Sequence, residues 1–170
     1  MQQTQPGLPA SPSGAEAFDA AENSDPSGTA DTFVWIEEHA WLYKLLKSPQ
    51  NRSPTFRLPD LLSACVSATL AAPNGIHALF EYLGTRLVLR DPDTVRRRET
   101  MWRHQYILLQ TLQRSPMNRH PNPKFQLDQL TTAAVALCRE ADPSGATVLK
   151  HARRNMAQRA RAQPPGPSSG

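Results

Sequence analysis

The sequence WIEEHAWLYKLLKSPQNR at residues 35–52 recurs without gaps as WRHQYILLQTLQRSPMNR at residues 102–119. The shared residues of the first copy are Trp35, Leu42, Leu45, Ser48, Pro49, Asn51 and Arg52, which recur as Trp102, Leu109, Leu112, Ser115, Pro116, Asn118 and Arg119. After a two-residue insertion in the second copy, Pro54, Phe56, Leu58, Leu61, Ala64 and Val66 recur as Pro123, Phe125, Leu127, Leu130, Ala133 and Val135. This many matches in one order indicates an internal duplication.

Each copy predicts the same series of elements. Apolar side chains after each tryptophan have helical spacing, and the Ser-Pro that follows ends the helix. The segments 54–58 and 123–127 alternate polar and apolar side chains, which predicts one short strand in each copy. Two further helices follow in each copy, with expected bounds 60–71, 76–89, 128–141 and 146–161 and glycine turns at 73–75 and 143–145. The expected fold is therefore mainly α, with two tandem repeats of helix, short strand, helix and helix.

Composition predicts where the folded units begin and end. Residues 1–31 are rich in Pro, Ser, Gly and Ala and predict a disordered acidic tail. The repeat units are expected at 32–90 and 101–162, joined by a linker at 91–100 and followed by a disordered tail at 163–170. No apolar run approaches the roughly 20 residues that cross a bilayer, and the first residues do not resemble a secretory signal. We therefore expect a cytoplasmic protein without a membrane partner.

Charge is unevenly distributed along the chain. Residues 1–31 contain five acidic residues and no Lys or Arg, so the rest of the chain has 19 basic against 10 acidic side chains. A body this basic favours polyanionic partners, with nucleic acid first and acidic membrane surface second, and solubility alone is the alternative explanation.

Little in the sequence points to catalysis. Cys65 and Cys138 lie in apolar helical patterns and outside any Cys-x-x-Cys pair, so both are expected to be free thiols that pack as small hydrophobes. The histidines lack metal-ligand spacing, and the chain has no Gly-rich phosphate loop, nucleophile elbow or zinc pattern. We expect no catalytic residue, no metal and no cofactor, and hence a protein that is not an enzyme.

The series of strand, helix, glycine turn and helix resembles the ribbon-helix-helix family of DNA-binding proteins. The resemblance covers residues 53–90 and, more weakly, 122–161. It implies that two such units pair their strands into an antiparallel ribbon that enters the major groove, and a duplicated chain supplies both units about a pseudo-two-fold axis. The alternative is a helical repeat in which 54–58 and 123–127 are extended connections.

The ribbon interpretation assigns roles to individual residues. Phe56, Leu58, Phe125 and Leu127 are expected to face the core, because alternate side chains lie on one face of a strand. The DNA base-reading residues on the outer face are then Thr55, Arg57, Lys124 and Gln126, since Arg and Lys suit guanine and Asn and Gln suit adenine.

Phosphate contacts are expected at two kinds of place. The resemblance implies contacts at the start of each final helix, at Asn74, Gly75, Ser144 and Gly145, where backbone N–H groups favour an anion. Basic runs add Arg96, Arg97 and Arg98, together with Arg153 and Arg154 on a helix that also carries Lys150, Arg159 and Arg161. Charged runs are also typical of solvated linkers and helix surfaces.

Two recurring features have both a binding and a structural interpretation. Trp35, Trp41 and Trp102 could stack on bases, but their helical spacing with leucines favours packing in the core. The repeated Asn-Arg at 51–52 and 118–119 could contact a ligand, and a structural cap and turn is the simpler explanation.

The sequence therefore predicts a sequence-specific DNA-binding accessory or regulatory protein whose partner is double-stranded DNA. The alternative is a non-enzymatic helical protein-protein interaction module. A homodimer and a protein partner both stay open.

Overall fold

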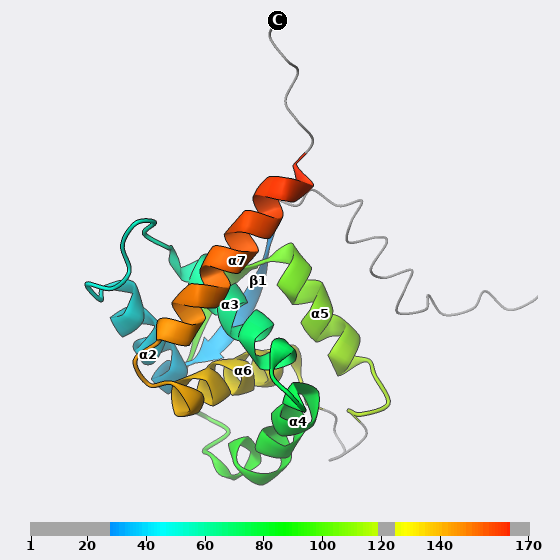
Figure 1. Cartoon of the computed structure of the whole chain (residues 1–170). Coiled ribbons are helices and arrows are strands. Elements are labelled where there is room, and N and C mark those ends of the chain that lie inside the picture. Colours follow the sequence, from blue (N-terminus) through cyan, green and yellow to red (C-terminus); the bar gives the residue numbers. More distant parts are fainter. Residues whose placement is uncertain (1–27, 119–124, 164–170) are drawn as a thin grey trace, which may run out of the picture.

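The computed structural model describes residues 28–118 and 125–163, and it is mainly helical with one two-stranded antiparallel sheet (Figure 1). The elements are β1 (Thr29–Trp35), α2 (Ile36–Leu46), α3 (Leu58–Ala71), α4 (Gly75–Thr85), the 3₁₀ helix η1 (Leu87–Leu89), β2 (Arg96–Trp102), α5 (Arg103–Gln113), α6 (Leu127–Ala141) and α7 (Ala146–Ala162). No helix within the described residues is long and apolar enough to cross a membrane.

Both halves run strand, helix, helix, helix, so each strand precedes its Trp-led helix. The prediction of a strand at 54–58 was wrong, because this segment is irregular up to Arg57 and α3 begins at Leu58. The reason lies in Asn51, whose Nδ2 donates to the Phe56 carbonyl at 3.0 Å and whose Oδ1 accepts from the Phe56 amide at 2.8 Å. The groups that a strand would offer to a neighbouring strand are therefore already bonded to one side chain.

The second predicted strand fails for the same reason. Asn118 Nδ2 donates to the Phe125 carbonyl at 3.0 Å, and the Phe125 amide donates to Asn118 Oδ1 at 3.1 Å. Leu127 already belongs to α6, while residues 123–124 lie outside the described residues. Asn51 and Asn118 are buried, and each closes a loop, which is the structural interpretation of the repeated Asn-Arg.

The two real strands lie where a tail and a linker were expected. β1 pairs with β2 from Thr29↔Trp102 to Trp35↔Arg96. The first strand thus begins inside the predicted tail 1–31, and the second begins inside the predicted linker 91–100. Thr32 and Val34 of β1 are buried whereas Asp31 and Phe33 are exposed, which is the alternation of a strand with one covered face.

The halves are interleaved around α3 and α6. β1 packs on α6 and β2 packs on α3, so each strand lies against the middle helix of the other half (Figure 1). The last helices follow the same rule, since α7 packs on α3 and α4 packs on α6. The Trp35 amide donates to Thr132 Oγ1 at 3.1 Å, and the Trp102 amide donates to Ser63 Oγ at 2.9 Å, which fixes each strand end to its helix.

The crossing of α3 and α6 forms the centre of the core. Thr69 Oγ1 donates to the Ala134 carbonyl at 3.2 Å, and Cys138 Sγ donates to the Cys65 carbonyl at 3.4 Å. Both cysteines are free and buried, which confirms the prediction, and burial raises the pKa of the Cys65 thiol well above its ordinary value.

The large apolar side chains around this crossing are mostly covered. Phe56 and Phe125 are buried as expected, while Leu58 and Leu127 are partly buried at the first position of their helices. Trp35 is 2% exposed, so it packs in the core and offers no surface for stacking on a base.

Candidate nucleic-acid interface

The predicted base-reading residues that the structure describes do not lie on a strand. Thr55 is exposed in the irregular segment, and Arg57 is the N-cap of α3, where its amide donates to Asp60 Oδ2 at 3.0 Å. Gln126 is the exposed N-cap of α6, and its amide donates to Gln129 Oε1 at 2.7 Å. Lys124 lies outside the described residues.

These N-caps are also at opposite ends of the sheet. The start of α3 contacts the end of β2, because Trp102 Nε1 donates to Asp60 Oδ1 at 2.7 Å. The start of α6 contacts the beginning of β2, where Arg96 Nε lies 2.7 Å from Asp128 Oδ2. Arg57 and Gln126 therefore share no ribbon face, and these two residues do not form the outer face of a two-stranded ribbon.

The three arginines of the predicted linker are part of β2 and do not form one phosphate clamp. Successive side chains of a strand point to opposite faces, so Arg97 is separated from its neighbours. Arg96 pairs with Asp128 and lies over the Trp35 ring at 4.8 Å. Arg98 pairs with Asp31 across the sheet. Two of the three charges thus already have protein partners.

The predicted anion site at the start of α7 is occupied by a carboxylate of the chain itself. Asp142 Oδ2 accepts from the Thr147 amide at 2.9 Å, and its Oδ1 accepts from the Ser144 amide at 3.2 Å. Hydrogen bonds from the Ser144 hydroxyl first, and then from Thr147, lower the pKa of Asp142 to about 2. A phosphate at Ser144 and Gly145 would displace or face this negative charge, which disfavours the predicted contact at this turn.

The corresponding turn before α4 carries no such carboxylate contact among the described hydrogen bonds. Asn74 is exposed in a left-handed conformation with φ 56°, whereas Gly75 is buried. The Gly75 amide donates to the Ala72 carbonyl at 2.9 Å, so one of the expected anion donors is used within the turn.

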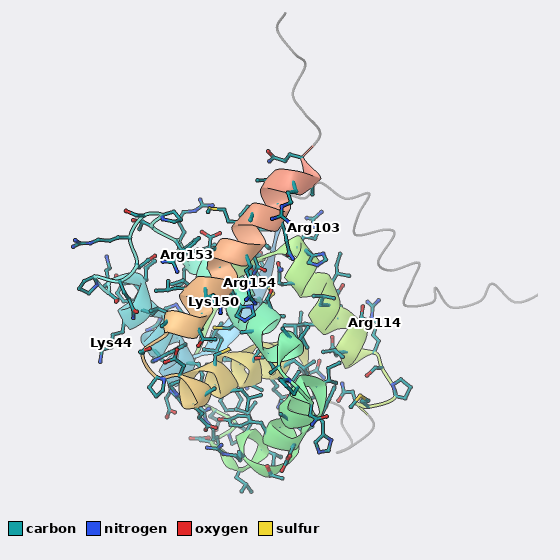
Figure 2. The ribbon with its side chains drawn as sticks, in the orientation of Figure 1. Lys44, Arg103, Arg114, Lys150, Arg153 and Arg154 are labelled. Carbon is teal, nitrogen blue, oxygen red and sulfur yellow. The ribbon has the colours of Figure 1, made fainter. Side chains whose placement is uncertain are left out.

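Helix α7 carries the most concentrated basic surface in the described part of the chain. Its 17 residues include no Asp or Glu. Its exposed cations are Lys150, Arg153, Arg154 and Arg161, and none of the four takes part in an ion pair within the described residues (Figure 2). We call these four residues the α7 basic surface.

Arg159 has a different role on the same helix. Its guanidinium lies over the Trp102 ring at 4.1 Å and 3.3 Å from Asp60 Oδ1, so it fixes α7 to the end of β2. Burial is the main cause that lowers the pKa of Arg159, with a further contribution from Arg57. Arg159 therefore holds the α7 basic surface in place and is itself mostly covered.

The positive charges of α7 contribute to a lowered pKa of a histidine on the same helix. The pKa of His151 is lowered, first by burial and then by the positive charges of Arg154 and Lys150. An anion that approaches this turn therefore meets a positive field with no acidic residue on the helix to offset it.

The basic surface is confined to one of the two final helices. α4 contains Glu81 and no Lys or Arg, and its exposed residues include Ile76 and His77. Lys44 of α2 and Arg114 after α5 are exposed cations outside α7 (Figure 2). Arg103, which sequence reasoning did not single out, begins α5 directly after Trp102, whose ring lies 4.1 Å from the Arg159 guanidinium carbon of α7.

An apolar cavity of about 270 Å³ opens between the α3–α4 and α6–α7 turns. Its walls are mainly small side chains, including Ala68, Ala72, Ala78 and Ala141, with Thr69 and Cys138 among the polar ones. No group of three His, Cys, Asp or Glu side chains within residues 28–118 and 125–163 is placed to hold a metal ion.

Comparison with known proteins adds no relative. No protein-family model matches the sequence, and neither a curated protein nor a solved structure is similar to the chain.

Proposed function

We propose that this protein is a DNA-binding accessory protein that holds double-stranded DNA through phosphate contacts along α7. The observation that carries the proposal is a helix with no acidic residue and four exposed cations that form no ion pair with any residue in 28–118 or 125–163. Neutralising phosphates releases condensed counterions, which is the main source of affinity for nucleic acid without base reading.

The geometry of α7 suits a duplex better than an unpaired strand. Lys150 and Arg161 are eleven positions apart, which is about 16 Å of helix and matches about five base pairs of duplex. Unpaired bases are held mainly by stacking on aromatic side chains. Trp35 is buried, Trp102 is covered by Arg159, and Trp41 is half-buried with its Nε1 donating to the Pro143 carbonyl at 3.1 Å.

We also propose that the two halves descend from one duplicated unit related by a pseudo-two-fold axis. The support is a set of paired contacts made by matched residues. The bond from Trp35 to Thr132 has its counterpart in the bond from Trp102 to Ser63, and the loop closed by Asn51 has its counterpart at Asn118. A duplication lets one half acquire a basic final helix while the other keeps a neutral surface.

The first prediction concerns charge reversal on α7. The double substitution Lys150→Glu and Arg154→Glu removes two phosphate contacts and should weaken binding to a random duplex at least about 10-fold at about 50 mM salt. The wild-type affinity should fall about 100-fold between about 50 and 200 mM salt, as expected for four phosphate contacts, and the variant should show a shallower slope. Fluorescence anisotropy of a labelled duplex gives both values.

The matched control is Lys44→Glu with Arg114→Glu, which makes the same change in net charge on exposed residues outside α7. This control should retain most of the affinity. Equal losses in the two variants would show that net charge alone drives binding and that α7 is not the contact surface.

The second candidate function is a helical module that docks a partner protein, and the apolar cavity between the two turns favours it. Apolar docking depends little on salt, in contrast to phosphate binding. A duplex affinity that is negligible at low salt would therefore favour this second candidate.

A further inference from the structure

The chain enters the described structure beside the α7 basic surface. The Arg103 amide donates to the Gly28 carbonyl at 3.0 Å, and the Arg103 guanidinium donates to the Thr29 carbonyl at 3.4 Å. Thr29 pairs with Trp102, whose ring lies 4.1 Å from the Arg159 guanidinium carbon. The segment that precedes Gly28 is therefore attached next to the C-terminal half of α7.

That segment is acidic. Residues 1–27 contain Glu16, Asp19, Glu22 and Asp25 and no Lys, Arg or His. Asp25 is three positions before Gly28, and a chain spans at most about 3.6 Å per residue, so its backbone is tethered within about 11 Å of this attachment point.

The acidic residues around the attachment point are already used by the fold. Asp31 pairs with Arg98, and Asp60 accepts hydrogen bonds from Trp102 and Arg159. The next carboxylates along the chain before Gly28 are those of residues 1–27. The exposed cations of α7 are in turn without an ion-pair partner in the described residues.

We propose that the carboxylates of residues 1–27 bind the α7 basic surface within the same chain and compete there with the phosphates of DNA. The inference rests on the proposed function and adds its regulation. Opposite charges attract the segment to the helix, and a short tether gives it an effective concentration on the order of millimolar. The same segment that neutralises α7 is displaced when a polyanion of higher charge density binds.

The contact itself can be tested in the absence of nucleic acid. Zero-length carbodiimide cross-linking joins a carboxylate to a lysine amine, and Lys150 is the one lysine of α7. Mass spectrometry of the full chain should find Glu22 or Asp25 linked to Lys150, with the product lost at about 1 M salt, where charges are screened within about 3 Å. Adding a random duplex should also suppress it.

Lys44 and Lys47 on and after α2 serve as internal controls, because both are exposed and neither belongs to the α7 basic surface. Links to Lys44 and Lys47 in the same yield as links to Lys150, or no link to Lys150, would overturn the inference.

The effect on DNA binding is tested in the full chain by neutralising the segment. The variant carries Glu16→Gln, Asp19→Asn, Glu22→Gln and Asp25→Asn. We expect it to bind a random duplex about 3- to 10-fold more tightly than the wild type at about 50 mM salt, with the difference vanishing as salt screens the intramolecular contact.

A matched control separates docking from net charge. It neutralises four exposed carboxylates outside the segment by Glu37→Gln, Glu81→Gln, Asp93→Asn and Glu140→Gln. The control should gain less than about twofold, because these groups lie outside the tethered segment. In the Lys150→Glu, Arg154→Glu background, neutralising residues 1–27 should give no gain.

The outcomes distinguish this inference from the proposed function. Salt-dependent DNA binding with equal gains in the two neutralised variants, or with none, would leave the function standing and overturn the competition by residues 1–27. Loss of salt-dependent binding in every form would overturn the function, and the competition with it.

Discussion

Asp60 and Gln129 both lie at the third position of a helix, but only Asp60 accepts a hydrogen bond from a tryptophan indole N–H. Each is the third residue of its helix, and each accepts a hydrogen bond from the N-cap amide. Asp60 has a second carboxylate oxygen, which accepts from Trp102 Nε1. Gln129 has a single oxygen, which the Gln126 amide uses, and Trp35 Nε1 is buried without a hydrogen-bond partner. Gln129 therefore has no second acceptor oxygen of the kind that Asp60 offers to Trp102.

The substitution Gln129→Glu should restore that acceptor without changing the size of the side chain. One oxygen still accepts from the Gln126 amide, the other becomes available to Trp35 Nε1, and the nearby Arg96 guanidinium favours the negative charge. We expect the free energy of unfolding to rise by about 1 kcal/mol, the net contribution of one satisfied hydrogen bond. Urea unfolding followed by tryptophan fluorescence measures it.

The reciprocal substitution Asp60→Asn is the control. It removes one acceptor and the charge that pairs with Arg159, so it should destabilise the protein. A Gln129→Glu protein no more stable than the wild type would contradict the proposed equivalence of the two helix starts.

At the scale of elements, the turn before α7 shows how a carboxylate fixes a helix start. Asp142 accepts hydrogen bonds from the Ser144 and Thr147 amides and from both of their hydroxyls. These bonds favour the ionised carboxylate, which is why its pKa is about 2. Asp142 therefore caps the helix that carries the α7 basic surface.

The substitution Asp142→Ala should lower the free energy of unfolding by about 1 kcal/mol at neutral pH, as loss of a helix cap does. Because the pKa of Asp142 is lower in the folded chain than in the unfolded chain, its contribution is complete above about pH 4 and is lost as the pH falls through about 2. The stability difference between wild type and variant should therefore shrink over that range in acid-dependent urea unfolding. A difference that stays constant down to pH 2 would show that the ionised carboxylate contributes nothing.

The helices were predictable from sequence, whereas the strands were not. The apolar spacing and the turns at Pro73 and Pro143 gave the helices that became α3, α4, α6 and α7, because those signals are local. The residues around Phe56 alternate in the sequence, but the side chain of Asn51 binds their backbone in place of a neighbouring strand. That contact leaves no periodic pattern in the sequence. β1 and β2 were missed because their sequences read as the end of an acidic tail and as a run of arginines, and only their pairing across the chain makes them strands.

The basic surface was partly predictable for the same reason. Lys150, Arg153 and Arg154 lie on one helix, and a run of cations without acids can be read directly. Arg96 and Arg98 looked equally free in the sequence, but Asp128 and Asp31 neutralise them across long sequence separations. Ion pairs of this kind decide which cations stay available for a ligand, and they form only when the fold brings distant segments together.

At the scale of the whole molecule, neither half encloses a core of its own. α3 is covered by β2 and α7, and α6 is covered by β1 and α4, so α3 and α6 each depend on elements of the other half. Separating the halves would expose the buried faces of both helices, including Leu61, Leu62 and Leu130. Within the described residues the two halves therefore share one core, and we expect them to unfold as a single unit.

This interleaving predicts that residues 1–93 and 94–170, expressed separately, each lack a cooperative unfolding transition. Residues 1–93 would leave the apolar side of α3 in water, and residues 94–170 would leave that of α6 in water. This costs about 25 cal/mol for every Å² of apolar surface exposed, and a half-chain has little other core to offset that cost. Mixing the two fragments should restore the helical circular dichroism and one thermal transition, since all the contacts of β1 with α6 and of β2 with α3 can form between chains.

As a control, a full-length chain cleaved at a protease site introduced between Asp93 and Thr94 after folding should keep its halves associated. Those two residues lie in the exposed turn before β2, so the cut removes chain continuity and no packing contact of the core. If either fragment alone unfolds cooperatively, then α3 or α6 is stable without the other half. The core would in that case be divided between two independent domains.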